Sequence, residues 1–160
     1  MVNKKITISY QIIKLGEDDY RLYSDLIEAS KMASQRAYSP YSGFHVGVAI
    51  RLDNQVIVEG NNQENAAYPS GLCAERVALF YSNSAYPDAA PIEMAISAHK
   101  DGLFTNDPIM PCGACRQVML ESEVRFKKHC KLILYSNSRI FVFQNHADLL
   151  PFGFSKDSLE

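Results

Sequence analysis

The chain has no strong excess of charge, no repeats and few cysteines. Among 160 residues, 16 lysines and arginines stand against 18 aspartates and glutamates, giving a formal net charge of -2. That balance lacks the cationic surface that a phosphate backbone requires, so nucleic acid is not expected as a partner. Internal repeats, linkers and low-complexity tracts are also missing, so residues 1–160 are expected to form a single domain.

The apolar stretch near the amino terminus, residues 6–15, is interrupted by polar side chains and is not followed by a small-residue cleavage site. We therefore expect no signal peptide, no membrane partner and a cytoplasmic location. In a reducing compartment, four cysteines favour metal binding or catalysis over disulfides.

Three of the four cysteines have the spacing of ligands for one metal ion. Cys73 precedes Glu75 by two positions, and Cys112 and Cys115 form a C-x-x-C pair. A catalytic zinc site provides three protein ligands and leaves the fourth position to water. Glu75 adds a general acid/base where that water would need one. The remaining cysteine, Cys130, is expected to be a small buried apolar residue.

The spacing also predicts where these side chains lie relative to two helices. Successive helical residues rotate by about 100°, so Cys73 and Glu75 inside one helix would diverge. Cys73 is therefore expected at the helix entrance, after the Pro-Ser-Gly break at 69–71. Cys112 and Cys115 lie three apart at the mouth of the next helix. Two helix N-termini, whose partial positive charge favours thiolates, would converge on the metal.

Three thiolates around Zn²⁺ leave a net charge of -1, which should raise the pKa of a bound water unless a cation offsets it. Arg76, beside Glu75, and Arg116, beside Cys115, are the candidates. We expect the guanidinium groups to donate hydrogen bonds to thiolate sulfur. A surface ion pair is the alternative for either arginine, and for Arg116 it is an equal interpretation.

Hydrophobic periodicity predicts alternating strands and helices. Strands are expected over 6–14, 44–50, 56–58, 92–98, 132–135 and 140–143, and helices over 19–37, 73–81 and 113–124, with a short helix after His146. This order indicates an α/β fold built on one mixed sheet.

The residues around the cysteines resemble the cytidine deaminase family, specifically its small branch with a three-cysteine zinc site. The matching segments are Ser-Pro-Tyr-Ser at 39–42, Phe44 with Val-Gly at 46–47, Asn-Gln-Glu-Asn-Ala at 62–66, Tyr-Pro at 68–69, Cys-Ala-Glu-Arg at 73–76 and Pro-Cys-Gly-Ala-Cys-Arg-Gln at 111–117. The resemblance covers roughly residues 20–155. It implies a three-layer α/β/α sandwich on one mixed, about five-stranded sheet.

The activity that the resemblance implies is hydrolytic deamination of cytidine and deoxycytidine to uridine and deoxyuridine, with release of ammonia, in pyrimidine salvage. It implies one Zn²⁺ per chain, held by Cys73, Cys112 and Cys115, with Glu75 moving protons. Asn62 and Glu64 match the family's sugar-binding pair. Phe44 matches an aromatic that lines the base pocket, although core packing is an equal interpretation, and Ala66 matches a backbone contact to the base.

The resemblance further implies a homotetramer with shared active sites, in which Phe154 enters a neighbouring subunit's pocket. Phe152, two residues earlier, is the other candidate for that insertion. Three histidines, His99, His129 and His146, fall outside every motif and are expected on the surface.

Two other functions fit part of the pattern. A deaminase of another cytosine-bearing small molecule, such as blasticidin S, would share the three cysteines and the glutamate. A structural zinc-binding interaction domain would leave Glu75 without a purpose and the fourth coordination position open.

Overall fold

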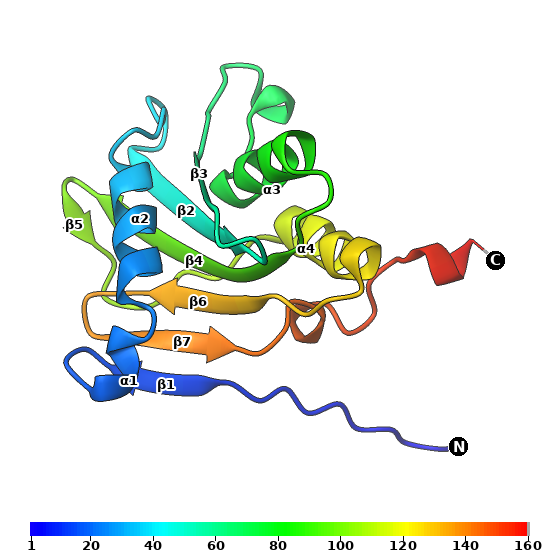
Figure 1. Ribbon diagram of the computed structural model, residues 1–160. Helices are drawn as coiled ribbons and strands as arrows, with labels where there is room; N and C mark the ends of the chain where they lie inside the picture. Colours follow the sequence, from blue (N-terminus) through cyan, green and yellow to red (C-terminus); the bar gives the residue numbers. More distant parts are fainter. Residues whose placement is uncertain (160) are drawn as a thin grey trace.

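The computed structural model describes residues 1–159, and the seven strands in this range belong to one sheet (Figure 1). The strands are β1 (Gln11–Lys14), β2 (Phe44–Leu52), β3 (Ile57–Asn61), β4 (Pro91–Lys100), β5 (Leu103–Phe104), β6 (Lys131–Tyr135) and β7 (Arg139–Phe143). Their order is β1-β7-β6-β4-β2-β3, and β5 pairs with β4. β4 and β6 run parallel and the other pairs run antiparallel, so the sheet is mixed as expected.

The expected count of about five strands is too low. β5 has two residues, too few to produce a visible alternation in the sequence. β1 forms only at the end of the expected 6–14 segment, where residues 11–14 pair with β7. Pairing with a distant strand decides the extent of β1, whereas β5 forms where the chain turns back onto the end of β4.

In the described part of the chain, four α-helices cover the two faces of the sheet (Figure 1). They are α1 (Asp18–Arg21), α2 (Ser24–Ser34), α3 (Ala74–Ala85) and α4 (Gly113–Phe126), with short 3₁₀ helices η1 (Tyr68–Ser70), η2 (Ala147–Leu149) and η3 (Lys156–Ser158). α2 packs on one face, and α3 and α4 pack on the other, which confirms the three-layer arrangement. The single helix expected over 19–37 is divided into α1 and α2.

Alternation along the strands separates the core into two apolar clusters. On β2, Val48 and Ile50 face α3 and α4, whereas Ala49 faces α2. Gly47 allows α2 to approach this strand, because a Cβ there would lie 2.1 Å from the Ser30 carbonyl oxygen. The backbone of α2 is therefore in direct contact with β2 at this position.

Two of the three histidines expected on the surface are buried. His99 is 5% exposed and His146 is 1% exposed, whereas the side chain of His129 is 78% exposed. His99 lies in β4, where its ring stacks on His45 at 4.7 Å between centroids. His146 immediately precedes η2 and is covered by tertiary packing that its local sequence does not indicate.

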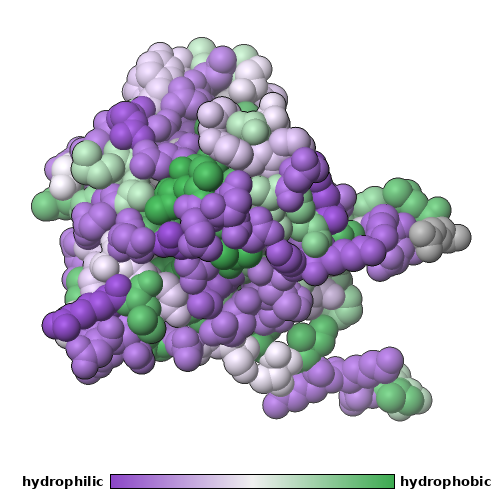
Figure 2. Space-filling view, in the orientation of Figure 1, coloured by the Kyte–Doolittle hydropathy of each residue, from purple (hydrophilic) through white to green (hydrophobic). Residues whose placement is uncertain are grey.

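The two ends of the described chain project from the body on the same side (Figure 1), and Figure 2 shows apolar side chains on both projections. Cys130 is buried, as expected.

Within residues 1–159, no helix combines the length and the apolar character needed to cross a membrane.

Candidate active site

Three thiols meet where α3 and α4 begin. Cys73 is the N-cap of α3 and Cys112 is the N-cap of α4, and both have extended backbone angles. Cys115 lies in the first turn of α4 and is fully buried. The predicted placement of Cys73 outside the helix is thus confirmed, and it leaves Glu75 inside the helix on the same side as the metal-binding thiols.

The spacing of the sulfur atoms fits a zinc ion. The Sγ atom of Cys112 lies 3.8 Å from that of Cys73 and 3.4 Å from that of Cys115. Tetrahedral zinc with bonds of about 2.3 Å to sulfur places its ligands about 3.8 Å apart. All three cysteines are free, and their sulfur atoms lie within 4.8 Å of one another. The donor set is that of a three-thiolate zinc site.

Glu75 is the buried carboxyl group beside these thiols, at 5% exposure. Burial raises its pKa above the ordinary value for a glutamate, and the negative charge of Cys73 adds to the increase. A carboxyl group whose pKa is moved toward neutrality can both accept and return a proton, as general acid/base catalysis requires. The residue that the sequence selected for proton transfer therefore has a suitable environment.

Arg76 lies against the thiol of Cys73, with 4.0 Å between Nη2 and Sγ. The pKa of Cys73 is lowered to about 5, first by its hydrogen bond with Cys115 and then by Arg76. Because Cys115 donates in that hydrogen bond and is buried, its own pKa is raised. Arg76 is thus placed to offset negative charge on the sulfur of Cys73.

Arg116 does not follow the expectation of a hydrogen bond to sulfur. Its Nε donates to the carbonyl oxygen of Pro111 at 2.9 Å, and its Nη1 donates to that of Leu149 at 3.1 Å. The side chain bridges the segment before Cys112 to η2, because carbonyl acceptors on both sides lie within its reach. It therefore contacts the metal-binding segment through the main chain.

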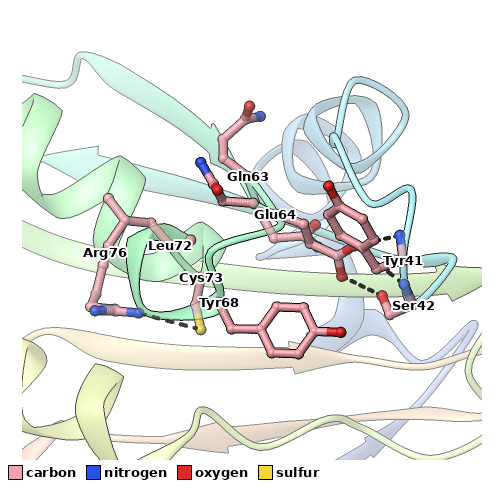
Figure 3. Close-up of a pocket in the computed structure, with 11 residues that line it drawn as sticks. Tyr41, Ser42, Gln63, Glu64, Tyr68, Leu72, Cys73 and Arg76 are labelled. Carbon is pink, nitrogen blue, oxygen red and sulfur yellow. Dashed lines mark hydrogen bonds between the residues drawn. The ribbon is translucent and has the colours of Figure 1, made fainter.

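A cavity of about 500 Å³ opens beside the thiols. It is lined by Tyr41, Ser42, Asn62, Gln63, Glu64, Asn65, Tyr68, Gly71, Leu72, Cys73 and Arg76. Figure 3 shows Cys73 and Arg76 at one end, here called the metal end, and Glu64 with Tyr41 and Ser42 at the other, here called the acidic end. Tyr68 lies between them, so one elongated ligand could contact both ends.

The carboxylate of Glu64 organises the acidic end. Its Oε2 accepts hydrogen bonds from the backbone N–H groups of Tyr41, at 2.9 Å, and Ser42, at 3.2 Å, and Oε1 accepts from the Ser42 hydroxyl. These hydrogen bonds, that of the Ser42 hydroxyl first, lower the pKa of Glu64. The group is held ionised as an acceptor facing the cavity.

Asn62 also lines the cavity, but its amide group binds the main chain of β2. Oδ1 accepts from the Val46 N–H at 2.8 Å, and Nδ2 donates to the Phe44 carbonyl oxygen at 2.9 Å. The amide therefore fixes the start of the strand that carries Phe44. Sequence reasoning gave Asn62 a direct contact to ligand and did not predict this use of the amide.

The other expected substrate contacts lie outside the lining of this cavity. Phe44 is half-buried, and Ala66 and Phe154 are exposed. Conversely, sequence reasoning assigned no site role to Tyr41, Ser42 or Tyr68, although they stand in segments that carry the resemblance. Their place in the matching segments at 39–42 and 68–69 is the feature of the sequence that could have indicated a role in the site.

Comparisons with known proteins agree with this geometry. The family model described as the cytidine and deoxycytidylate deaminase zinc-binding region matches residues 21–129. A cytidine deaminase of Sporosarcina psychrophila is 38% identical over 135 residues, covering 84% of this chain and 92% of the relative. One from Halalkalibacterium halodurans is 44% identical over 96 residues, covering 60% and 68%.

A solved structure shows the same similarity in three dimensions. The crystal structure of cytidine deaminase from Burkholderia pseudomallei has a TM-score of 0.68 and 38% sequence identity, covering 82% of this chain and 98% of that one. The matched family region is a zinc-binding region, and the three thiols supply the donors for one zinc ion per chain. The chain belongs to the cytidine and deoxycytidylate deaminase family.

Proposed function

We propose that this protein catalyses the hydrolytic deamination of cytidine and deoxycytidine to uridine and deoxyuridine, with release of ammonia, in pyrimidine salvage. The observation that carries the proposal is the buried carboxyl group of Glu75, which lies beside three thiols at one end of the cavity. Its raised pKa makes it a suitable proton carrier. The similar proteins described above are named cytidine deaminases.

Zinc, when bound, would supply the Lewis acidity that activates a water molecule at neutral pH. In the reaction an oxygen–carbon bond forms at C4 of the base and the bond from C4 to the exocyclic nitrogen breaks. Glu75 takes a proton from the attacking water, delivers it to N3, and later protonates the departing amino group. Burial of Glu75 supports this role, because it keeps the carboxyl group able to hold the proton between steps.

The acidic end suits the sugar of a nucleoside. The Glu64 carboxylate is already ionised and positioned by the main chain of residues 41 and 42, so it can accept hydrogen bonds from ribose hydroxyl groups. Asn62 contributes at the same end and holds β2 at Phe44. We place Phe44 and the backbone of Ala66 at the base, with Arg76 stabilising the thiolate of Cys73.

We further propose a cytoplasmic homotetramer in which each active site receives Phe154 from a neighbour. Phe154 is 59% exposed and Phe152 is 87% exposed, which is unusual for phenylalanine in a folded chain and provides apolar area for a partner subunit. The main chain at Phe154 accepts a hydrogen bond from Gln117 of α4, while the phenyl ring stays exposed. Phe154→Ala should raise KM while the tetramer persists, and the same variant at Phe152 separates the two candidates.

The test is ammonia release by the purified protein with cytidine, deoxycytidine and blasticidin S as separate substrates. We expect release with both nucleosides, about one zinc per chain, and loss of release in Glu75→Ala with zinc retained. Preference for blasticidin S would move the assignment to the other class of deaminase. A zinc-loaded protein that deaminates nothing would indicate a structural zinc domain.

A further inference from the structure

A second buried glutamate lies far along the helix that carries two of the zinc-binding cysteines. Glu123, on α4, is 8% exposed. Its Oε1 accepts hydrogen bonds from the backbone N–H groups of Cys130, at 2.7 Å, and His146, at 2.8 Å. Its Oε2 accepts from the N–H of Ala147 at 3.2 Å. A buried carboxylate is costly unless hydrogen-bonded, and here three main-chain donors compensate for burial.

The same helix holds the chain that follows. Arg116 donates to the carbonyl oxygen of Leu149 at 3.1 Å, and Gln117 donates through Nε2 to that of Phe154 at 2.7 Å. Residues 146–154 are therefore attached to α4 at their beginning, middle and end, and we call them the C-terminal strap.

Close packing joins the strap to α4 between these hydrogen bonds. A Cβ at Gly153 would lie 2.3 Å from Cδ2 of Leu120, so the main chain passes directly over that side chain. Arg116, Leu120 and Glu123 follow one another at spacings of four and three residues, which places them on one face of the helix. The strap thus lies along a single stripe of α4.

We propose that Glu123 is a positioning residue that, through these contacts, fixes the C-terminal strap and with it the phenylalanine that completes the substrate site. The inference rests on the proposed function, in which Phe154 contacts the base in a neighbouring subunit. α4 begins at the thiols of Cys112 and Cys115, so one rigid element sets the place of both the metal ligands and the strap.

The first experiment compares Glu123→Gln with Glu121→Gln in the full-length, zinc-loaded protein. Glutamine keeps the shape of the side chain, but it offers one acceptor oxygen and turns an NH₂ group toward a backbone N–H. Glu121 is an exposed carboxylate on the same helix and serves as the matched control.

We expect amide hydrogen exchange over residues 146–154 to become about tenfold faster in Glu123→Gln. KM for cytidine should rise about tenfold, as for loss of one base-stacking contact, while kcat and zinc content stay unchanged. Glu121→Gln should match the wild type in all four measurements.

A second variant, Gly153→Ala, loosens the strap without touching the carboxylate, because the new methyl group forces Leu120 aside. It should reproduce faster exchange and raised KM, and it keeps the proposal testable if Glu123→Gln does not fold. Unchanged exchange or unchanged KM in these variants would overturn the positioning role. Failure of the proposed function would appear differently, as wild-type protein that releases no ammonia.

Discussion

The two ends of the cavity are built in different ways. At the metal end, Cys73 caps α3 and Glu75, at 5% exposure, is held inside its first turn. At the acidic end, Glu64 follows β3 on a loop, and the neighbouring Tyr41 is 53% exposed. Proton transfer needs a buried and rigid carboxyl group, whereas hydroxyl recognition needs only an ionised acceptor that is correctly placed.

The largest effect should come from Glu75→Gln at the metal end. The amide cannot carry the proton, so kcat should fall by about 10²- to 10⁴-fold. Zinc content and KM should stay close to wild type, because the thiols and the acidic end are unaffected. Steady-state kinetics together with metal analysis checks this prediction. If the variant kept half of the wild-type activity, Glu75 would not be the residue that transfers the proton.

Acid should destabilise the fold independently of either end, through His146. Burial lowers the pKa of this ring from 6.5 to about 4, although the charge of Glu123 opposes the shift. Between those pH values the unfolded chain binds a proton that the folded chain does not, so the contribution is complete above pH 6.5 and is lost toward pH 4. The loss is about 3 kcal/mol.

Denaturant unfolding at several pH values measures this contribution. His146→Phe should flatten the decline in acid, whereas Glu121→Gln, at an exposed position, should leave it unchanged. A decline of equal slope in His146→Phe would place the acid sensitivity elsewhere.

Arg76→Ala should weaken zinc retention by about 10- to 100-fold, because the thiolate of Cys73 loses its nearest cation. Competition with a chelator measures the change, and Arg21→Ala, at an exposed position, is the control. We expect the variant to fold. Wild-type zinc retention together with wild-type turnover would contradict a role for Arg76 at the metal end.

The smallest effect should follow Glu64→Gln at the acidic end. KM for cytidine should rise about tenfold, since one charge-assisted hydrogen bond to the sugar is weakened. Zinc content should not change, because the metal end is a separate part of the cavity. If zinc affinity fell along with substrate affinity, the two ends would not be independent.

The cysteines could be located in advance because their constraint is local. The break at 69–71 and the 100° helical rotation place Cys73 outside α3, and the structure agrees. Arg116 could not be located in this way. Its carbonyl acceptors belong to Pro111 and to Leu149, which is 33 residues later in the chain.

The sequence also contained no indication of which single polar residues are buried. His99 and His146 stand in no motif, and the ring of His99 is stacked on His45, which lies in a different strand. The short pairing of β1 also depends on a strand that is distant in the sequence, β7. Propensity and periodicity contain no information on which distant backbone group will be the neighbour.

By itself, the sequence determined the α/β class and the three zinc-binding thiols, and it singled out Glu75 beside them as the acid/base candidate, because residue type and helical geometry are local properties. Tertiary structure alone decided that the Asn62 amide binds β2, that Arg116 turns to carbonyl oxygens and that Glu123 holds the C-terminal strap. Each of these depends on which donors and acceptors the folded chain brings within hydrogen-bonding distance.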